Sequence, residues 1–278
     1  MKRPQNELPD TWDGCKKEFL ARLPRVSQSY DQRTIFQDSC RLFSLSIRGS
    51  VTTNTTDKES IEEQYNNFLV KYGKNGMEAI SHLFALTIQA MEISRSDFLG
   101  HIYEAINATV KSFGQYFTPD SVARVMARCT IPGEKAKEHK IVTLYDPTCG
   151  AGALLIEAAE AFVDHGGRQG DLLVYADDLD ATAACIAYVQ FSLLGYPAIV
   201  RRMDTLALRV YEGPWFTPGY FMHAMPMRLM VERMDEAVAP KKEGTDGDDN
   251  SKNSETPHVG LQKNLFNVRE LIQQEFNF

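Results

Sequence analysis

Ile141-Val-Thr-Leu-Tyr145 and the directly following Asp146-Pro-Thr-Cys-Gly-Ala-Gly-Ala153 decide the fold. The apolar run predicts a strand, and the glycines predict a tight turn into a helix over 151–164. Gly150 and Gly152 let a ligand approach the backbone, and the free N–H groups of the following helix favour a carboxylate or a phosphate. Leu155 stands where a dinucleotide fingerprint has its third small residue, so an ordinary glycine-rich turn is the alternative.

Two more apolar runs, at 171–176 and 198–203, flank a helical segment at 180–194. Strands that alternate with helices predict a parallel sheet with right-handed crossovers. Apolar residues at helical spacing predict helices over 28–48, from Thr56-Asp57 to Gly73, and over 77–93. The predicted fold class is therefore α/β, a helical N-terminal region followed by a partial doubly wound, Rossmann-like parallel sheet.

Acidic residues follow two of the predicted strands. Asp177 and Asp178 end the second strand, where a nucleotide site needs an acceptor for the ribose hydroxyls. Asp180 has a structural alternative as the N-cap of the next helix. Asp204 ends the third strand and should lie at the same carboxyl edge of the sheet, where open parallel sheets bind ligands.

Four motifs occur in a fixed order, namely Gly114-Gln-Tyr-Phe-Thr-Pro119, the glycine loop at 146–152, Ala176-Asp-Asp-Leu-Asp180 and Met203-Asp-Thr-Leu206. With the preceding segment 97–104, this order resembles the N6-adenine DNA methylases, and most closely the modification (M) subunits of type I restriction-modification systems. The resemblance spans roughly 97–206. It implies a class I methyltransferase fold, S-adenosyl-L-methionine as cofactor, DNA as substrate, and restriction-modification subunits as possible partners.

The resemblance also implies roles for single residues. The implied cofactor-binding residues are Gln115, Tyr116, Phe117, Thr118, Pro119, Asp146, Gly150, Ala151, Gly152, Asp178 and Asp204. Phe117 and Thr118 would contact the methionine end of the cofactor. Asp178 stands where the family usually has Glu and would hold the ribose hydroxyls, and Asp204 would lie near the adenine. A turn in which Pro119 begins a helix is the alternative interpretation of 114–119, and both can hold at once.

The catalytic residues stay unknown from the sequence. Members of the family hold the target amine with Asn- or Asp-Pro-Pro followed by an aromatic residue, and this chain has no such tetrad. The nearest segment is Glu212-Gly-Pro-Trp215, for which we favour a surface turn with Trp215 and Phe216 packed inward. About 30 residues separate Asp204 from a polar linker, enough for one or two more strands. We therefore expect that a partner supplies the missing parts, that the protein binds cofactor without methylating, or that the sequence is a truncated copy.

Composition narrows the class of protein. The formal net charge of -7 predicts weak binding of DNA by this chain alone, because DNA affinity comes largely from basic residues. The five cysteines are scattered without metal-ligand spacing, so no metal site and no disulfide scaffold is expected. No apolar run approaches the roughly 20 residues that cross a membrane, and no signal peptide is recognisable, which predicts a cytoplasmic protein.

The predicted domain organisation has four parts. A helical domain spans 1–110, a cofactor-binding domain 111–238, a disordered linker 239–264 and a helical segment 265–278. The leading functional hypothesis is an S-adenosylmethionine-dependent DNA adenine-N6 methyltransferase, active alone or only with a partner. The alternative is a non-catalytic, cofactor-binding decoy or regulator of a restriction-modification complex, and a small-molecule methyltransferase is a third, weaker hypothesis.

Overall fold

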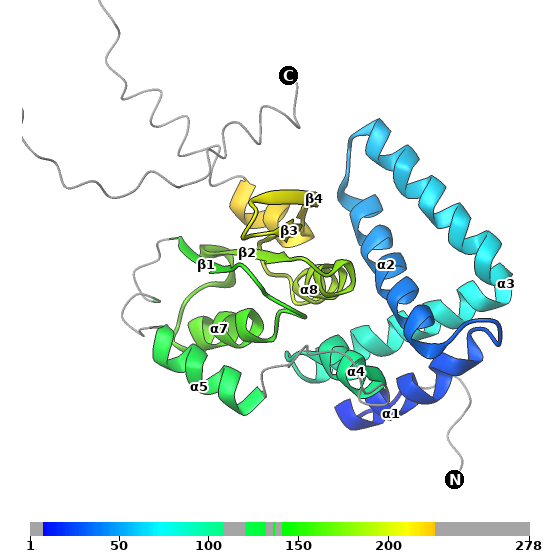
Figure 1. Cartoon of the computed structure of the whole chain (residues 1–278). Coiled ribbons are helices and arrows are strands. Elements are labelled where there is room, and N and C mark those ends of the chain that lie inside the picture. The colour runs from blue at the N-terminus through cyan, green and yellow to red at the C-terminus, as the bar shows by residue number, and fades with distance from the viewer. Residues whose placement is uncertain (1–7, 108–119, 132–135, 137–140, 226–278) are drawn as a thin grey trace, which may run out of the picture. The chain divides into compact units, whose positions relative to one another are not determined.

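The computed structural model describes residues 8–107, 120–131, 136 and 141–225. Its N-terminal part is helical, with α1 Trp12–Arg22, the short η1 Leu23–Arg25, α2 Gln32–Val51, α3 Thr55–Ile93 and α4 Phe98–Asn107. Then follow α5 Asp120–Thr130, β1 Val142–Asp146, α7 Ala153–Asp164, η2 Gln169–Asp171, β2 Leu172–Asp178, α8 Ala181–Leu193, β3 Ala198–Asp204, β4 Arg209–Phe216 and η3 Tyr220–Ala224. Figure 1 shows α1 to α4 on one side of the sheet-bearing part.

The helical prediction for the N-terminal region is confirmed, with one correction at a cap. Gly73 has φ 63° and kinks α3 at the position where the sequence predicted a helix end. The N-cap of α3 is Asn54, not Thr56 or Asp57, because the Asn54 side chain accepts from the N–H groups of both of these residues. An amide oxygen one turn earlier thus satisfies two of the free donors of the helix.

The sheet has the order β1-β2-β3-β4, and its first three strands are parallel as predicted. Their register brings Asp146 opposite Ala176 and Asp178 opposite Arg202, so the strands end at a common edge. β4 differs from the strands before it, because it returns antiparallel to β3 as a hairpin. The α/β fold class is confirmed, with an antiparallel edge strand added to the parallel sheet.

Helices α7 and α8 pack on one face of the sheet, and η3 covers part of the other face. One large buried cluster includes Phe36 and Phe98 from the N-terminal helices, Ile186 from α8 and Trp215 from β4. A smaller cluster on the opposite face joins Leu173 and Ile199 of the sheet to Tyr220 and Ala224 of η3. The core therefore runs without a break from the helical part to the sheet. No helix among the described residues is long and apolar enough to cross a membrane.

Candidate functional site

The glycine loop between β1 and α7 is held by hydrogen bonds to the end of β2. The N–H of Cys149 donates to the carbonyl of Asp177 at 2.9 Å, and the N–H of Gly150 donates to Asp178 Oδ2 at 2.8 Å. Asp146 closes the start of the loop by accepting from the N–H of Thr148 at 2.9 Å. The predicted loop and the predicted acid thus lie in direct contact at the carboxyl edge of the sheet.

The two glycines of the loop have different surroundings. Both have positive φ, 56° at Gly150 and 92° at Gly152. A Cβ at Gly150 would meet nothing within 4 Å, whereas a Cβ at Gly152 would meet Phe191 Cζ at 2.8 Å. Open space for a ligand therefore lies above Gly150. Packing against Phe191 of α8 already requires a glycine at 152, and the role of Gly152 in ligand approach stays a prediction.

The start of α7 leaves donors for a ligand. Gly152 is the N-cap of α7, and because glycine has no side chain, no side-chain cap bonds the first turn. The first N–H groups of a helix need an acceptor, and they favour a negative charge. A carboxylate placed over Gly150 would satisfy both requirements.

The two adjacent acids at the end of β2 are distinguished by Arg201. Asp177 is fully buried, and both of its oxygens accept from the guanidinium of Arg201, at 2.7 and 2.6 Å. Tyr145 donates a further hydrogen bond to Asp177 at 3.0 Å, and burial, together with this bond, raises the pKa of Tyr145 to about 12. Asp177 is therefore a structural acid, and the ribose candidate among the pair is Asp178.

Asp178 is half-buried and accepts from two backbone donors, Gly150 on Oδ2 and Asp180 on Oδ1, both at 2.8 Å. Burial raises its pKa, although the two backbone hydrogen bonds oppose the shift. A carboxylate has about four lone-pair positions, so it can accept further bonds from a ligand. Asp180 itself caps α8 by accepting from Thr182 and Ala183, which agrees with the structural alternative stated for it.

The remaining predicted residues fall into two groups. Asp204 is half-buried at the end of β3, where one of its oxygens accepts from the N–H of Ala207 at 2.9 Å. Ala151 is buried within the glycine loop. Gln115, Tyr116, Phe117, Thr118 and Pro119 lie outside the described residues.

A residue that the sequence analysis missed, Gln190 of α8, supports the loop from below. Its buried side chain donates to the carbonyl of Ala151 at 2.9 Å and to Asp97 Oδ1 at 2.8 Å, and it accepts from the N–H of Leu99 at 3.0 Å. It therefore ties the glycine loop to the start of α4. The available signal was a single amide within an otherwise apolar helical segment.

The segment Glu212-Gly-Pro-Trp215 lies inside β4, so the surface turn predicted for it is wrong. The inward packing of Trp215 is confirmed, since it is 4% exposed and contacts Tyr188 edge to face. Glu212 forms ion pairs with Arg41 at 2.6 Å and with Arg202 at 3.2 Å. Trp215 pairs with Val200 of β3 and lies in the buried core. In this position its ring is not exposed for stacking on a base.

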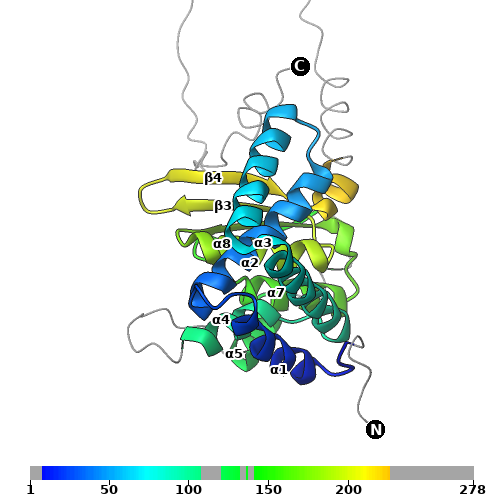
Figure 2. The same cartoon turned by 90° about the vertical axis from the view of Figure 1, so that its right-hand side faces the viewer.

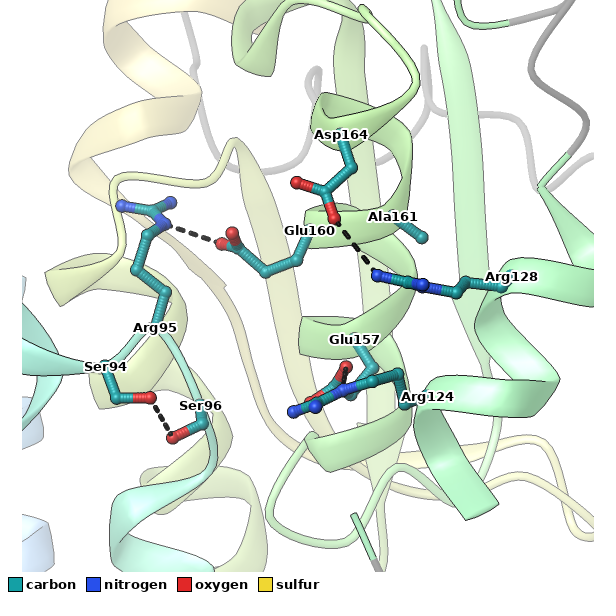
Figure 3. A pocket seen from close by; sticks show the side chains of 9 residues that line it. All are labelled: Ser94, Arg95, Ser96, Arg124, Arg128, Glu157, Glu160, Ala161 and Asp164. Carbon is teal, nitrogen blue, oxygen red and sulfur yellow. Dashed lines mark hydrogen bonds and ion pairs between the residues drawn. The ribbon is translucent and has the colours of Figure 1, made fainter. Parts of the chain in front are cut away.

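A pocket of about 310 Å³ lies elsewhere, between α5, α7 and the connection of α3 to α4 (Figure 3). Arg95, from the connection of α3 to α4, and Arg124 and Arg128, from α5, approach the carboxylates of α7 from opposite sides. The ion pairs are Arg95–Glu160, Arg124–Glu157 and Arg128–Asp164. In these ion pairs the positive charges of the lining arginines are balanced by the carboxylates of α7. None of the predicted cofactor residues that the structure describes lines this pocket, so the candidate site is the carboxyl edge of the sheet instead.

Comparison with known proteins finds a family model and two solved structures that are similar to this part of the chain. Residues 94–212 match the family model described as N-6 DNA Methylase. A type I restriction-modification system methyltransferase subunit from Streptococcus thermophilus is 22% identical, with a TM-score of 0.38 over 68% of this chain and 39% of that one. A Listeria monocytogenes protein assigned to the class I S-adenosylmethionine-dependent methyltransferases is 15% identical, with a TM-score of 0.36 over 67% of this chain and 52% of that one. The chain thus spans about half or less of the length of these two proteins. The stretch 94–212, which contains the glycine loop, Asp178 and Asp204, is thus similar to the N-6 DNA methylases, and it makes up less than half of this chain.

Proposed function

We propose that the chain binds S-adenosylmethionine at the carboxyl edge of its sheet and serves in the N6 methylation of adenine in DNA. The observation that carries the proposal is the bond between the two motifs, since Gly150 donates to Asp178 within the family-matched segment. In this arrangement the N–H groups of the loop and of α7 would hold the methionine carboxylate. Asp178 would accept from the ribose hydroxyls, and Asp204 would lie beside the adenine.

When bound, S-adenosylmethionine supplies an electrophilic methyl group. The task of the protein is then to hold that methyl in line with an acceptor amine. In this proposal the described residues of the glycine loop and the sheet edge would bind and orient the cofactor. The residues that would hold the target amine stay unassigned.

The proposal is tested by isothermal titration of the full chain with S-adenosylmethionine. We expect a saturable 1:1 isotherm, with S-adenosylhomocysteine as competitor. Matched titrations with NAD and ATP serve as controls, because a generic glycine-rich turn would accept their phosphates equally well. Absence of binding, or equal binding of all three compounds, would overturn the proposal.

A second function is favoured by the burial of Trp215. If this chain contributes no stacking residue, it would bind cofactor as a regulator or as one part of a larger methyltransferase. The test is incorporation of tritiated methyl into adenine of mixed-sequence duplex DNA, with and without co-purifying proteins. Transfer only with a partner supports a shared active site, and transfer by the chain alone would exclude the regulatory function.

A further inference from the structure

A continuous row of side chains runs along β4 and is rich in arginine. Successive members contact one another by cation–π or ion-pair interactions at 2.6 to 5.6 Å. We call it the β4 arginine row, and in order it consists of Arg48, Trp215, Arg41, Glu212, Arg202, Tyr211 and Arg209. The row begins on α2 and ends at the turn of the β3–β4 hairpin, so its members come from two distant parts of the sequence.

The row carries excess positive charge in an acidic protein. The row has four guanidinium groups and one carboxylate, Glu212, which forms ion pairs with Arg41 and Arg202. The row itself therefore has an excess of three positive charges, while the whole chain has a net charge of -7. Burial and the neighbouring charge of Arg41 lower the pKa of Arg48, which is the expected result of crowding cations together. An anionic ligand would relieve this repulsion.

Aromatic and apolar groups are interleaved with these charges. Tyr211 is 44% exposed and lies within 5.4 Å of Arg202 and 5.0 Å of Arg209. The register of the hairpin shifts between Arg202 and Met203, opposite this part of β4. At the turn itself, Leu206 is 99% exposed and Leu208 is 69% exposed, with Leu208 held at a φ of 54°. Figure 2 shows this hairpin reaching beyond the neighbouring elements.

We propose that the β4 arginine row is a contact surface for the phosphate backbone of duplex DNA, with Leu206 and Leu208 of the hairpin turn touching the bases. The proposal rests on the proposed function, because it places DNA beside the predicted methyl donor. Arg202 lies opposite Asp178 in the sheet and donates to the carbonyl of Leu179, so the row adjoins the cofactor edge.

The dimensions and the chemistry fit DNA better than an acidic protein. The 8 residues of β4 extend over about 26 Å at roughly 3.3 Å each, which matches about eight base-pair steps of 3.4 Å. Exposed leucines beside arginines are the groups that other DNA-binding proteins insert between base steps. An acidic peptide would use the arginines but would leave Leu206 in water.

The experiment measures binding of a fluorescent 20-base-pair duplex to the full chain by anisotropy, from low to moderate salt. Arg48→Gln with Arg209→Gln should weaken binding at least tenfold near 50 mM salt and lower the slope of log affinity against log salt by about 2, roughly one per lost phosphate contact. Leu206→Ser with Leu208→Ser should weaken binding about tenfold while leaving the slope unchanged.

Matched controls separate a local effect from a general one. Arg22→Gln with Arg25→Gln removes the same charge from the region of α1, and Val70→Ser removes an apolar side chain that is 87% exposed on α3. Both should bind DNA as the wild type does. The exposed single variant Arg209→Gln keeps the test valid if Arg48→Gln impairs folding, which thermal denaturation would reveal.

Three results would overturn the inference. They are no binding of DNA by the wild type at low salt, equal affinity of the row variants and their controls, and binding of an acidic peptide in preference to the duplex. The last result would assign the row to a protein partner. Titration with S-adenosylmethionine in the same samples distinguishes this failure from failure of the proposed function, since cofactor binding without DNA binding leaves the latter standing.

Discussion

A side chain at position 150 would extend into open space, whereas one at position 152 would meet Phe191. This difference allows a paired prediction. Gly150→Ala places a methyl group in open space, so it should cost only about 1 to 2 kcal/mol of left-handed strain but weaken S-adenosylmethionine binding at least tenfold. Gly152→Ala drives a methyl group against Phe191 and should lose a further 1 to 3 kcal/mol, roughly, from overpacking. Calorimetry and thermal denaturation of both variants check this. Wild-type affinity in Gly150→Ala would contradict the proposed ligand position.

The raised pKa of Asp178 predicts that the free energy of unfolding depends on pH. Its pKa in the folded protein is raised above the ordinary 3.8 by burial, so the folded state holds the proton more tightly than the unfolded state. Stability should therefore fall as pH rises from 3.8 through the raised pKa, and stay at the lower level above it. Asp178→Asn removes this component of the pH profile, because an amide does not titrate there.

The same variant tests the ribose assignment. Asp178→Asn should weaken cofactor binding at pH 7 by about 1 to 3 kcal/mol, because the ribose hydroxyls lose a charged acceptor. In the wild type, affinity should fall as the carboxylate is protonated at low pH. Equal affinities of wild type and variant across the pH range would show that Asp178 is not the ribose ligand.

At the scale of elements, α8 supports the glycine loop through the side-chain amide of Gln190, which donates a hydrogen bond to the Ala151 carbonyl. Gln190→Leu removes a buried hydrogen bond from the Ala151 carbonyl and from the Leu99 N–H, at about 1 to 3 kcal/mol for each of these two groups. Asp97 also loses its bond to Gln190 but keeps the one from the N–H of Gly100. We expect a lower melting temperature and weaker binding of S-adenosylmethionine. Gln169→Leu is the matched control, because it also loses a bond to a backbone carbonyl, that of Leu194, but does not touch the loop. Equal cofactor affinity in the two variants would remove Gln190 from the site.

At the scale of the whole molecule, the shared core bears on how the helical part and the sheet unfold. The sequence predicts a domain boundary near 110, yet the buried cluster includes side chains from both sides of it. The ion pair of Arg41 with Glu212 joins the same two parts. We therefore expect one cooperative unfolding transition for the described part of the chain.

The two tryptophans report on the two parts separately. Trp12 contacts Phe98 in the helical part, and Trp215 lies in β4. Trp215→Phe leaves only the first reporter, and Trp12→Phe leaves only the second. The fluorescence midpoint of each single-tryptophan variant should coincide with the midpoint of its own helical circular dichroism signal. Midpoints that differ between the two probes within one variant would indicate independently unfolding domains.

The sequence by itself determined the three parallel strands, the glycine loop and the acids at the carboxyl edge of the sheet. These features follow from local periodicity and from the rule that parallel strands end together, so no distant contact is needed to predict them. The start of α3 was predicted two residues late, because several polar residues there can cap a helix equally well.

Only the tertiary structure decided which polar residues are available to a ligand. Arg201 engages Asp177 and leaves Asp178, Phe191 accounts for Gly152, and Gln190 supports the loop from α8. Arg41 and Arg48 come from α2 and hold Glu212 and Trp215 in a strand that the sequence presented as a turn. Each of these outcomes depends on partners more than 20 residues away along the chain. Local patterns carry no information about such partners, because burial and pairing are set by how the elements pack.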